Sequence, residues 1–109
     1  MIVVTAKHLI PKGYTGMAIF PFIILRDTAD KNNAMLINHE RIHLRQQLEL
    51  LILPFFLWYF AEYLLRRIRY KEHFAAYRRI GFEEEAYSNE QNPDYLQTRT
   101  FWKFLDYIK

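Results

Sequence analysis

The feature that most constrains this chain is the pattern His-Glu-x-x-His formed by His39, Glu40 and His43. In an α-helix, residues four apart lie on one face and one turn apart, so the two imidazoles would point the same way and could share a metal ion. Glu40 would lie at the flank of that face, where its carboxylate can reach a water on the metal without binding the metal itself. Two imidazoles beside a carboxylate suit Zn²⁺ and a general base.

The pattern carries this chemistry only if it lies inside a helix, and its surroundings favour one. No Gly or Pro interrupts the range Lys31–Leu53, and the polar segment 26–33 offers several N-cap residues. Apolar side chains recur there at helical spacing: Leu36, Ile37, Leu44, Leu48, Leu51 and Ile52. We therefore expect a helix over about Lys31–Leu53. The alternative interpretation is a solvated polar helix face. We expect Gln46 and Gln47 to be solvated, with a contact to the outer shell of the site as the alternative.

The chain length predicts one domain, because 109 residues suffice for a single core. The segments before the motif helix add strands to this domain. Ile2–Thr5 is short and β-branched, which predicts a strand. The apolar run Met17–Leu25 contains Pro21, which cannot donate to a sheet ladder. This run predicts an edge or bulged strand, or alternatively a buried β-hairpin that caps the helices. We expect one α+β domain over 1–109, with a small β-rich part at 1–30 and a helical part at 31–109.

A second apolar segment, Leu50–Ala61, raises the question of a membrane span. It holds twelve residues between two glutamates, whereas a spanning helix needs about 20 apolar residues and excludes charge. We expect a core helix here. Aromatic residues followed by an arginine cluster are also typical of a helix at a membrane interface. A peripheral membrane contact through Leu50–Leu65 is therefore an alternative.

Composition and charge narrow the remaining function classes. The chain has no Cys, which excludes disulfides and Cys-type zinc sites, so any metal must be held by His and carboxylate. The net charge is a mild +3, and the one dense basic cluster, at 66–71, is typical of a solvated helix end. We expect no nucleic-acid partner. The N-terminus lacks the pattern of a secretory signal, so we expect a cytoplasmic protein, with membrane association as the alternative.

A catalytic zinc needs a third protein ligand, and the sequence offers several. No His follows His43 closely, and a lone later residue such as His73 is more often solvated or part of a core. A glutamate on a second helix is the better candidate. Glu83 lies in an acidic segment, 82–90, that predicts a short helix able to fold back across the first one, and we favour it. The alternatives are Glu62 and Glu84.

The C-terminal part predicts a last helix, with Asn92 as its cap and Pro93 at its first position. Its apolar residues give a broad face that can pack on the core: Leu96, Phe101, Trp102, Leu105 and Ile108. In so small a protein this helix could cover a shallow cleft and keep an enzyme latent. The residue that stabilises an oxyanion is not identified, and the candidates by type are Tyr70, Tyr77, Tyr87, Tyr95 and Arg99.

Two short motifs carry a resemblance to a known family. His39-Glu40-Arg41-Ile42-His43, followed by Glu83-x-Glu85-Ala86, resembles the gluzincin class of zinc metallopeptidases, and most of all its small stand-alone members, the minigluzincins. The resemblance covers about Met17–Glu90. It implies a zincin-like core in which His39, His43 and Glu83 bind zinc and Glu40 is the base that activates water.

The resemblance also implies that Met17–Phe20 is an edge strand beside bound peptide. One position departs from the class: four residues after the third ligand, where an Asp often orients a ligand His, this chain has Tyr87. We expect a zinc-dependent peptide-bond hydrolase, active or latent, that acts on a peptide or protein substrate. The alternatives are a non-catalytic zinc-binding scaffold and a membrane-surface helical protein.

Overall fold

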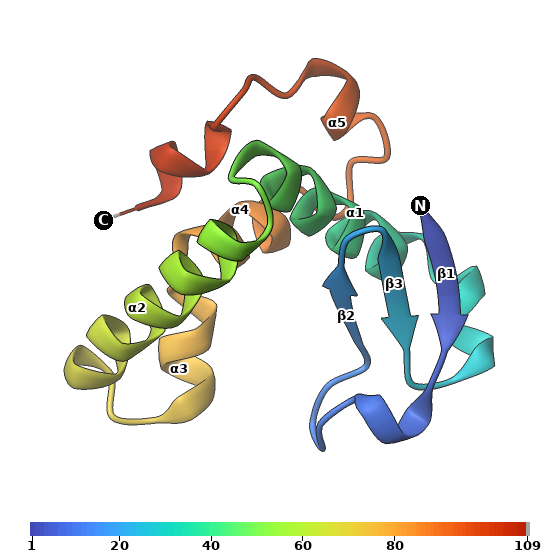
Figure 1. Cartoon of the computed structure of the whole chain (residues 1–109), viewed down its shortest axis with the longest axis horizontal. Coiled ribbons are helices and arrows are strands. Elements are labelled where there is room, and N and C mark those ends of the chain that lie inside the picture. Colours follow the sequence, from blue (N-terminus) through green and yellow to red (C-terminus); the bar gives the residue numbers. More distant parts are fainter. Residues whose placement is uncertain (109) are drawn as a thin grey trace.

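The computed structural model describes residues 1–108 and has an α+β fold, as predicted. Its strands are β1 (Ile2–Thr5), β2 (Gly16–Ile19) and β3 (Phe22–Leu25). Its α-helices are α1 (Ala34–Glu49), α2 (Leu53–Arg69), α3 (His73–Arg78), α4 (Gly81–Asn89) and α5 (Tyr95–Thr98). Short 3₁₀ turns span Lys7–Leu9, Thr28–Asn32 and Lys103–Tyr107. The sheet lies against one side of α1, and α2, α3 and α4 lie together on the other side of the molecule (Figure 1).

The sheet has the strand order β1-β3-β2, with β1 parallel and β2 antiparallel to the central strand β3. The predicted strand Ile2–Thr5 is confirmed. Met17–Leu25 is not a single strand but most of a hairpin, with Pro21 in the turn between β2 and β3. A proline without an N–H fits a turn better than a ladder, which explains why the hairpin alternative is correct. The hairpin leaves β2 at the edge of the sheet.

One face of the sheet packs on α1 and fixes the position of that helix. Ile23 and Leu25 of β3 are fully buried and form a core cluster with Ala18 and with Leu44 of α1. The N-terminus of α1 is capped by Asn33, whose side-chain oxygen accepts from the Leu36 N–H at 3.1 Å. The hairpin and the capped helix together hold β2 beside the middle of α1.

The predicted helix Lys31–Leu53 is too long at both ends, and its C-terminal end is a sharp bend. Helix α1 ends at Glu49 and α2 runs at 112° to it. Between them Leu51 and Ile52 adopt positive φ angles of 61° and 63°, a region that L-residues with side chains rarely occupy. Pro54 lies in the first turn of α2, where the missing N–H costs nothing. The bend folds α2 back over α4.

Helix α2 packs less completely than the predicted core helix. Its only buried residues are Phe55 and Glu62, and Phe55 joins a second core cluster with Ile80, Phe82 and Phe104. Within residues 1–108 no single helix is long and apolar enough to cross a membrane, while α1 and α2 taken together pass that test of length and composition across their bend.

The predicted acidic helix over 82–90 is confirmed as α4, but the long C-terminal helix is wrong. Only α5 and the turn Lys103–Tyr107 form, because the backbone becomes extended at Arg99, whose side chain reaches into the core. Most of the apolar residues assigned to that helix are exposed. Phe104, which was not among them, is the residue that is buried.

Candidate metal centre

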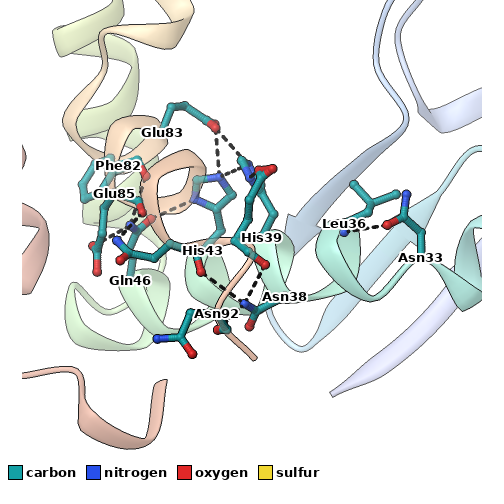
Figure 2. Close-up of polar contacts among 12 residues, drawn as sticks. Asn33, Leu36, Asn38, His39, His43, Gln46, Phe82, Glu83, Glu85 and Asn92 are labelled. Carbon is teal, nitrogen blue, oxygen red and sulfur yellow. Dashed lines mark hydrogen bonds and ion pairs between the residues drawn. The ribbon is translucent and has the colours of Figure 1, made fainter. Parts of the chain in front are cut away.

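Helices α1 and α4 bring three of the predicted ligands to one point. His39 and His43 lie one turn apart on α1, and Glu83 approaches them from the first turn of α4 (Figure 2). Glu83 Oε1 lies 3.2 Å from His39 Nε2 and 3.1 Å from His43 Nε2, and the two Nε2 atoms are 3.2 Å apart. All three side chains are buried. Among residues 1–108 this is the only such group of His and carboxylate side chains.

The ring of His43 is oriented by Gln46, one turn further along α1. The Gln46 amide nitrogen donates to Phe82 O at 3.1 Å and to Glu85 Oε1 at 2.9 Å, which fixes the direction of the amide. Its oxygen must therefore be the atom that faces His43 Nδ1 at 2.8 Å. In neutral His43 the proton sits on Nδ1, and the Nε2 lone pair points at Glu83.

The ring of His39 is oriented in the same way by a carboxylate. His39 Nδ1 lies 2.8 Å from Glu90 Oε1, just beyond the end of α4. A carboxylate that accepts from Nδ1–H fixes the tautomer and makes the imidazole a stronger ligand. Glu90, and not the residue at position 87, is therefore the group that orients His39. Tyr87 instead packs its ring against His39, with 4.4 Å between ring centroids.

Three acceptor atoms thus face one another, and this arrangement calls for a cation. Burial lowers the pKa of His43, but the adjacent Glu83 carboxylate outweighs burial and raises it to about 9. For the Glu83 carboxyl, burial acts in the opposite direction and raises the pKa. The imidazoles outweigh burial here too, His43 foremost, and hold the pKa of Glu83 well below its ordinary value. In the metal-free protein a proton held between these groups supplies the positive charge.

The same three atoms fit a zinc ion. In a tetrahedral zinc site with ligands at about 2.0–2.1 Å, the ligand atoms lie about 3.3–3.4 Å apart. The three edges of the triangle here are 3.1–3.2 Å, so only a slight outward adjustment is required. Two imidazole nitrogens and one carboxylate oxygen are also a donor set that zinc accepts, with one position left open.

Glu83 has a further partner that sequence reasoning missed. The hydroxyl of Tyr59, from α2, donates to Glu83 Oε2 at 2.6 Å, which leaves Oε1 for the imidazoles. Burial, reinforced by the Glu83 charge, raises the pKa of Tyr59, so the phenol keeps its proton and stays a donor. Tyr59 lies in the apolar segment after the bend, and nothing in the local sequence indicates which way α2 folds back.

The alternative third ligands point elsewhere. Glu62 accepts from the Gly81 N–H at 2.9 Å and from Arg66 at 3.0 Å. Glu84 forms an ion pair with Arg79 at 3.7 Å. Neither belongs to the group of convergent ligand atoms. His73 likewise lies apart from that group and bonds to two tyrosine hydroxyls instead.

Glu40 lies where two cavities meet. A cavity of about 640 Å³ is bounded by β2, α1 and α2, and it reaches His43 and Glu83. A second, of about 440 Å³, reaches His39. Glu40 lines both, together with Tyr14, Gly16 and Tyr77. Burial raises the pKa of Glu40.

The residues 91–108 line neither of these two cavities. The prediction that the C-terminal part covers the cleft is therefore wrong. That part packs instead against α1, α2 and α4, through Arg99, Trp102 and Phe104.

The wall formed by β2 comes close to Glu40 at Gly16. A Cβ placed there would make an ordinary contact with Glu40 Oε2, at 3.8 Å, but would be tight against the neighbouring strand, at 3.3 Å from the Ile24 carbonyl oxygen. Further along, Gln47 ties β2 to α1: its amide nitrogen donates to Ala18 O, and its oxygen accepts from the Phe20 N–H, both at 2.7 Å. The expectation that Gln46 and Gln47 are solvated is wrong, since both are fully buried and hold parts of the site together.

Of the five residues proposed by type as oxyanion donors, only Tyr77 lines both cavities. Tyr87 lines the smaller one. Tyr95 and Arg99 bond to Glu85 on the far side of α4, and Tyr70 lines neither cavity. Tyr14, which sequence reasoning did not single out, lies in both cavity walls with its hydroxyl 2.5 Å from His73 Nε2. Burial raises the pKa of Tyr14, so its hydroxyl is a donor at neutral pH.

No protein-family model, curated protein or solved structure matches this chain significantly. The resemblance to gluzincins therefore stays a prediction that rests on the residues themselves.

Proposed function

We propose that this protein is a zinc-dependent peptide-bond hydrolase. The proposal depends on the convergence of three buried acceptor atoms, from His39, His43 and Glu83, beside a second carboxylate, Glu40. Metal-binding geometry and an adjacent base are the two parts that hydrolysis by this class of site requires. The edge strand and the two cavities on either side of Glu40 supply room for an extended chain.

When bound by His39, His43 and Glu83, zinc would act as a Lewis acid that lowers the pKa of a coordinated water towards about 7. Glu40 accepts the proton of the attacking water and later passes it to the leaving amine. Burial, which raises the pKa of Glu40, brings this carboxyl closer to the proton affinity that such a shuttle needs.

Phenol hydroxyls are the best available donors for the negative oxygen that develops on the scissile carbonyl. Tyr14 and Tyr77 both line the region where the cavities meet, next to Glu40. Burial raises the pKa of both, so each keeps its O–H. We assign the role to Tyr14, because His73 holds its ring at the cleft wall. With the Tyr63 hydroxyl donating to His73 Nδ1, the His73 Nε2–H donates to the Tyr14 oxygen, and the Tyr14 proton stays free for the oxyanion. A donor aimed at such an oxygen stabilises the transition state more than the ground state.

The two cavities predict an unequal preference for the residues that flank the scissile bond. The larger cavity is lined mainly by apolar and aromatic side chains, among them Met17, Phe55, Phe56 and Phe60. The smaller one includes charged groups at its wall, Arg78 and Glu90. We expect substrates with a large apolar side chain on one side of the cleaved bond and a smaller or polar one on the other.

The test is the substitution Glu40→Gln in the zinc-loaded protein. It should lower hydrolysis of a peptide library by about 10²–10⁴-fold while one zinc per chain stays bound, because the amide cannot accept the proton. Glu84→Gln, which changes the same charge on α4 outside the cleft, is the matched control and should keep both activity and zinc. Hydrolysis at the wild-type rate by Glu40→Gln would refute the assignment. A zinc-loaded wild type that cleaves no member of the library would refute the enzyme and favour the non-catalytic scaffold.

A further inference from the structure

Helix α2 leaves one side uncovered, and that side is apolar along most of its length. From Leu53 to Leu65, every residue that is more than a third exposed is apolar. Among the large apolar residues of α2, the highest exposed fractions are those of Leu53 (66%), Leu57 (64%), Phe60 (61%), Leu64 (48%), Leu65 (66%) and, one turn further, Ile68 (77%). These residues recur at spacings of three and four, so they form one continuous stripe on the helix. We call it the α2 stripe. In Figure 1 the outer side of α2 faces away from the other helices and the sheet.

A stripe of this kind indicates a binding surface, because a chain that stays in water rarely exposes so many large apolar side chains together. The charges around it indicate what it binds. Exposed basic residues follow directly at the C-terminal end of the helix, namely Arg67, Arg69 and Lys71. Glu62, the one acidic residue of α2, is buried and bonded to Arg66 and to the Gly81 N–H. The helix thus presents an apolar face with a cationic end and no exposed acid of its own. Glu72, the exposed acid that follows Lys71, is occupied as the cap of α3, where it accepts from the Phe74 and Ala75 N–H groups.

We infer that the α2 stripe docks on an anionic lipid bilayer, with α2 lying in the plane of the interface. A strongly amphipathic helix buries its apolar face at the level of the acyl chains, while cationic side chains at its end contact anionic headgroups. Trp58, at the border of the stripe, is 38% exposed and has the amphipathic ring typical of that depth. One helix of 17 residues lying flat needs no spanning segment.

A second copy of this chain fits the stripe less well. If two α2 helices paired antiparallel through their stripes, Arg67 and Arg69 of one copy would face the region of Leu51–Leu53 in the other. That region is apolar, and the nearby Glu49 already accepts from Arg99 at 2.6 Å. The basic end would gain no acidic partner, whereas phosphatidylserine headgroups supply one.

Docking would place the bilayer next to the cleft. The inference about substrate that follows rests on the proposed function, whereas the docking itself does not. Phe60 belongs both to the stripe and to the wall of the larger cavity, alongside Phe56 and Tyr63. A bilayer against the stripe therefore lies next to the cavity mouth. The substrate class this favours is an apolar segment close to a membrane surface.

The test is co-sedimentation of the full chain with vesicles of phosphatidylcholine and phosphatidylserine in a 3:1 ratio, compared with pure phosphatidylcholine. Wild type should bind the anionic vesicles at least about tenfold more tightly, and high salt should weaken this binding. The double substitution Leu57→Glu/Leu64→Glu should lower binding by at least about tenfold. Its matched control is Ile2→Glu/Leu9→Glu, which adds the same charge at exposed apolar positions of the β-rich part and should bind as wild type.

A second variant, Arg67→Gln/Arg69→Gln, keeps the stripe and removes two charges. It should lose most of the preference for phosphatidylserine and keep the weak binding to phosphatidylcholine. Glu40→Gln should bind vesicles as wild type does, so that failure of hydrolysis and failure of docking are told apart.

Three results would overturn the inference. The first is a wild type that does not sediment with the anionic vesicles. The second is equal binding by Leu57→Glu/Leu64→Glu and by its control. The third is a dimer in sedimentation equilibrium that Leu57→Glu/Leu64→Glu dissociates, without vesicle binding, which would assign the stripe to a second copy.

Discussion

Two glutamates of α4, Glu83 and Glu85, are both buried and lie two residues apart, yet their surroundings are opposite in character. Glu85 is surrounded by donors: the Gln46 amide nitrogen at 2.9 Å, the Tyr95 hydroxyl at 2.7 Å and the Arg99 guanidinium, which contacts both carboxylate oxygens. Glu83 receives one hydroxyl, from Tyr59, and otherwise faces the two imidazole nitrogens of α1.

The difference distinguishes a structural cluster from a site. Around Glu85 the negative charge has a resident counter-charge in Arg99, whose pKa stays above its ordinary value because its bonds to Glu85 and Glu49 outweigh its burial. Among residues 1–108 no Arg or Lys pairs with Glu83, whose only positive partner in the metal-free protein is an imidazole that has to take up a proton. A buried charge without a permanent partner is costly unless something binds there. The first cluster holds the fold together, and the second is available for a metal.

The largest expected effect is the loss of zinc affinity when Glu83 is replaced. Glu83→Ala removes one of three ligands and should weaken zinc binding by at least about a thousandfold, or about 4 kcal/mol. The measurement is competition with a chelator of known affinity. Glu84→Ala, on the neighbouring and partly exposed position, is the control and should bind zinc as wild type does. Equal affinities for the two variants would mean that Glu83 is not a ligand.

The next largest effect is on the stability of the fold, at the cluster of Arg99, Glu85 and Glu49. Arg99→Met leaves the buried carboxylates of Glu85 and Glu49 without their counter-charge and should lower the free energy of unfolding by about 3 kcal/mol or more, measured by urea denaturation. Removal of the residues beyond Tyr95 takes away the same guanidinium and should unfold the protein. A latent enzyme would instead gain hydrolytic activity when these residues are removed. Such a gain would contradict the packing of the C-terminal part on the core, away from the two cavities.

A smaller effect is expected at the groups that orient the imidazoles. Glu90→Gln keeps the size of the side chain but removes the carboxylate beside His39 Nδ1, and should weaken zinc binding by about 10–100-fold. Asn89→Gln is not a suitable comparison, because Asn89 bonds to Glu85 O and Tyr107. Gln91→Glu, at the exposed next position, changes one charge without touching His39 and should leave affinity unchanged. If Glu90→Gln binds zinc as tightly as wild type does, Glu90 does not strengthen His39 as a ligand.

The smallest expected effect is the change of zinc affinity with pH, counted per pH unit. In the metal-free protein the His43 pKa is raised to about 9, so zinc must displace a proton at neutral pH. Zinc affinity should therefore rise by about tenfold per pH unit from pH 7 to pH 8, with proton release on binding. The sign is opposite for the metal-free fold, which loses the stability contributed by protonated His43 as pH rises from about 6.5 through 9. An affinity independent of pH over this range would show that no proton is displaced.

The local parts of the site could be predicted from the sequence because they depend on one helix. His39, Glu40 and His43 are four residues apart at most, and helical periodicity alone determines how they project. Glu83 could be favoured because α4 is a separate short helix. Glu90 lies seven residues after Glu83, two turns along the same side of α4, so that spacing is a signal that could have found it.

Tertiary features escaped prediction for physical reasons. The bend after Glu49 uses Leu51 and Ile52 at positive φ, where neither residue type is expected, and the only local signal is Pro54. Because the bend determines where α2 lies, the contact of Tyr59 with Glu83 could not be predicted from the sequence either. Gln46 and Gln47 are polar residues on a helix, and only the packed partners on α4 and β2 show why they are buried.

The most direct test of the central claim is an X-ray absorption spectrum of the wild-type protein loaded with one equivalent of zinc. We predict a four-coordinate ion with nitrogen and oxygen ligands at about 2.0–2.1 Å, of which two are imidazoles. A protein that retains no zinc, an ion surrounded only by oxygen, or a number of imidazole ligands other than two would contradict this prediction.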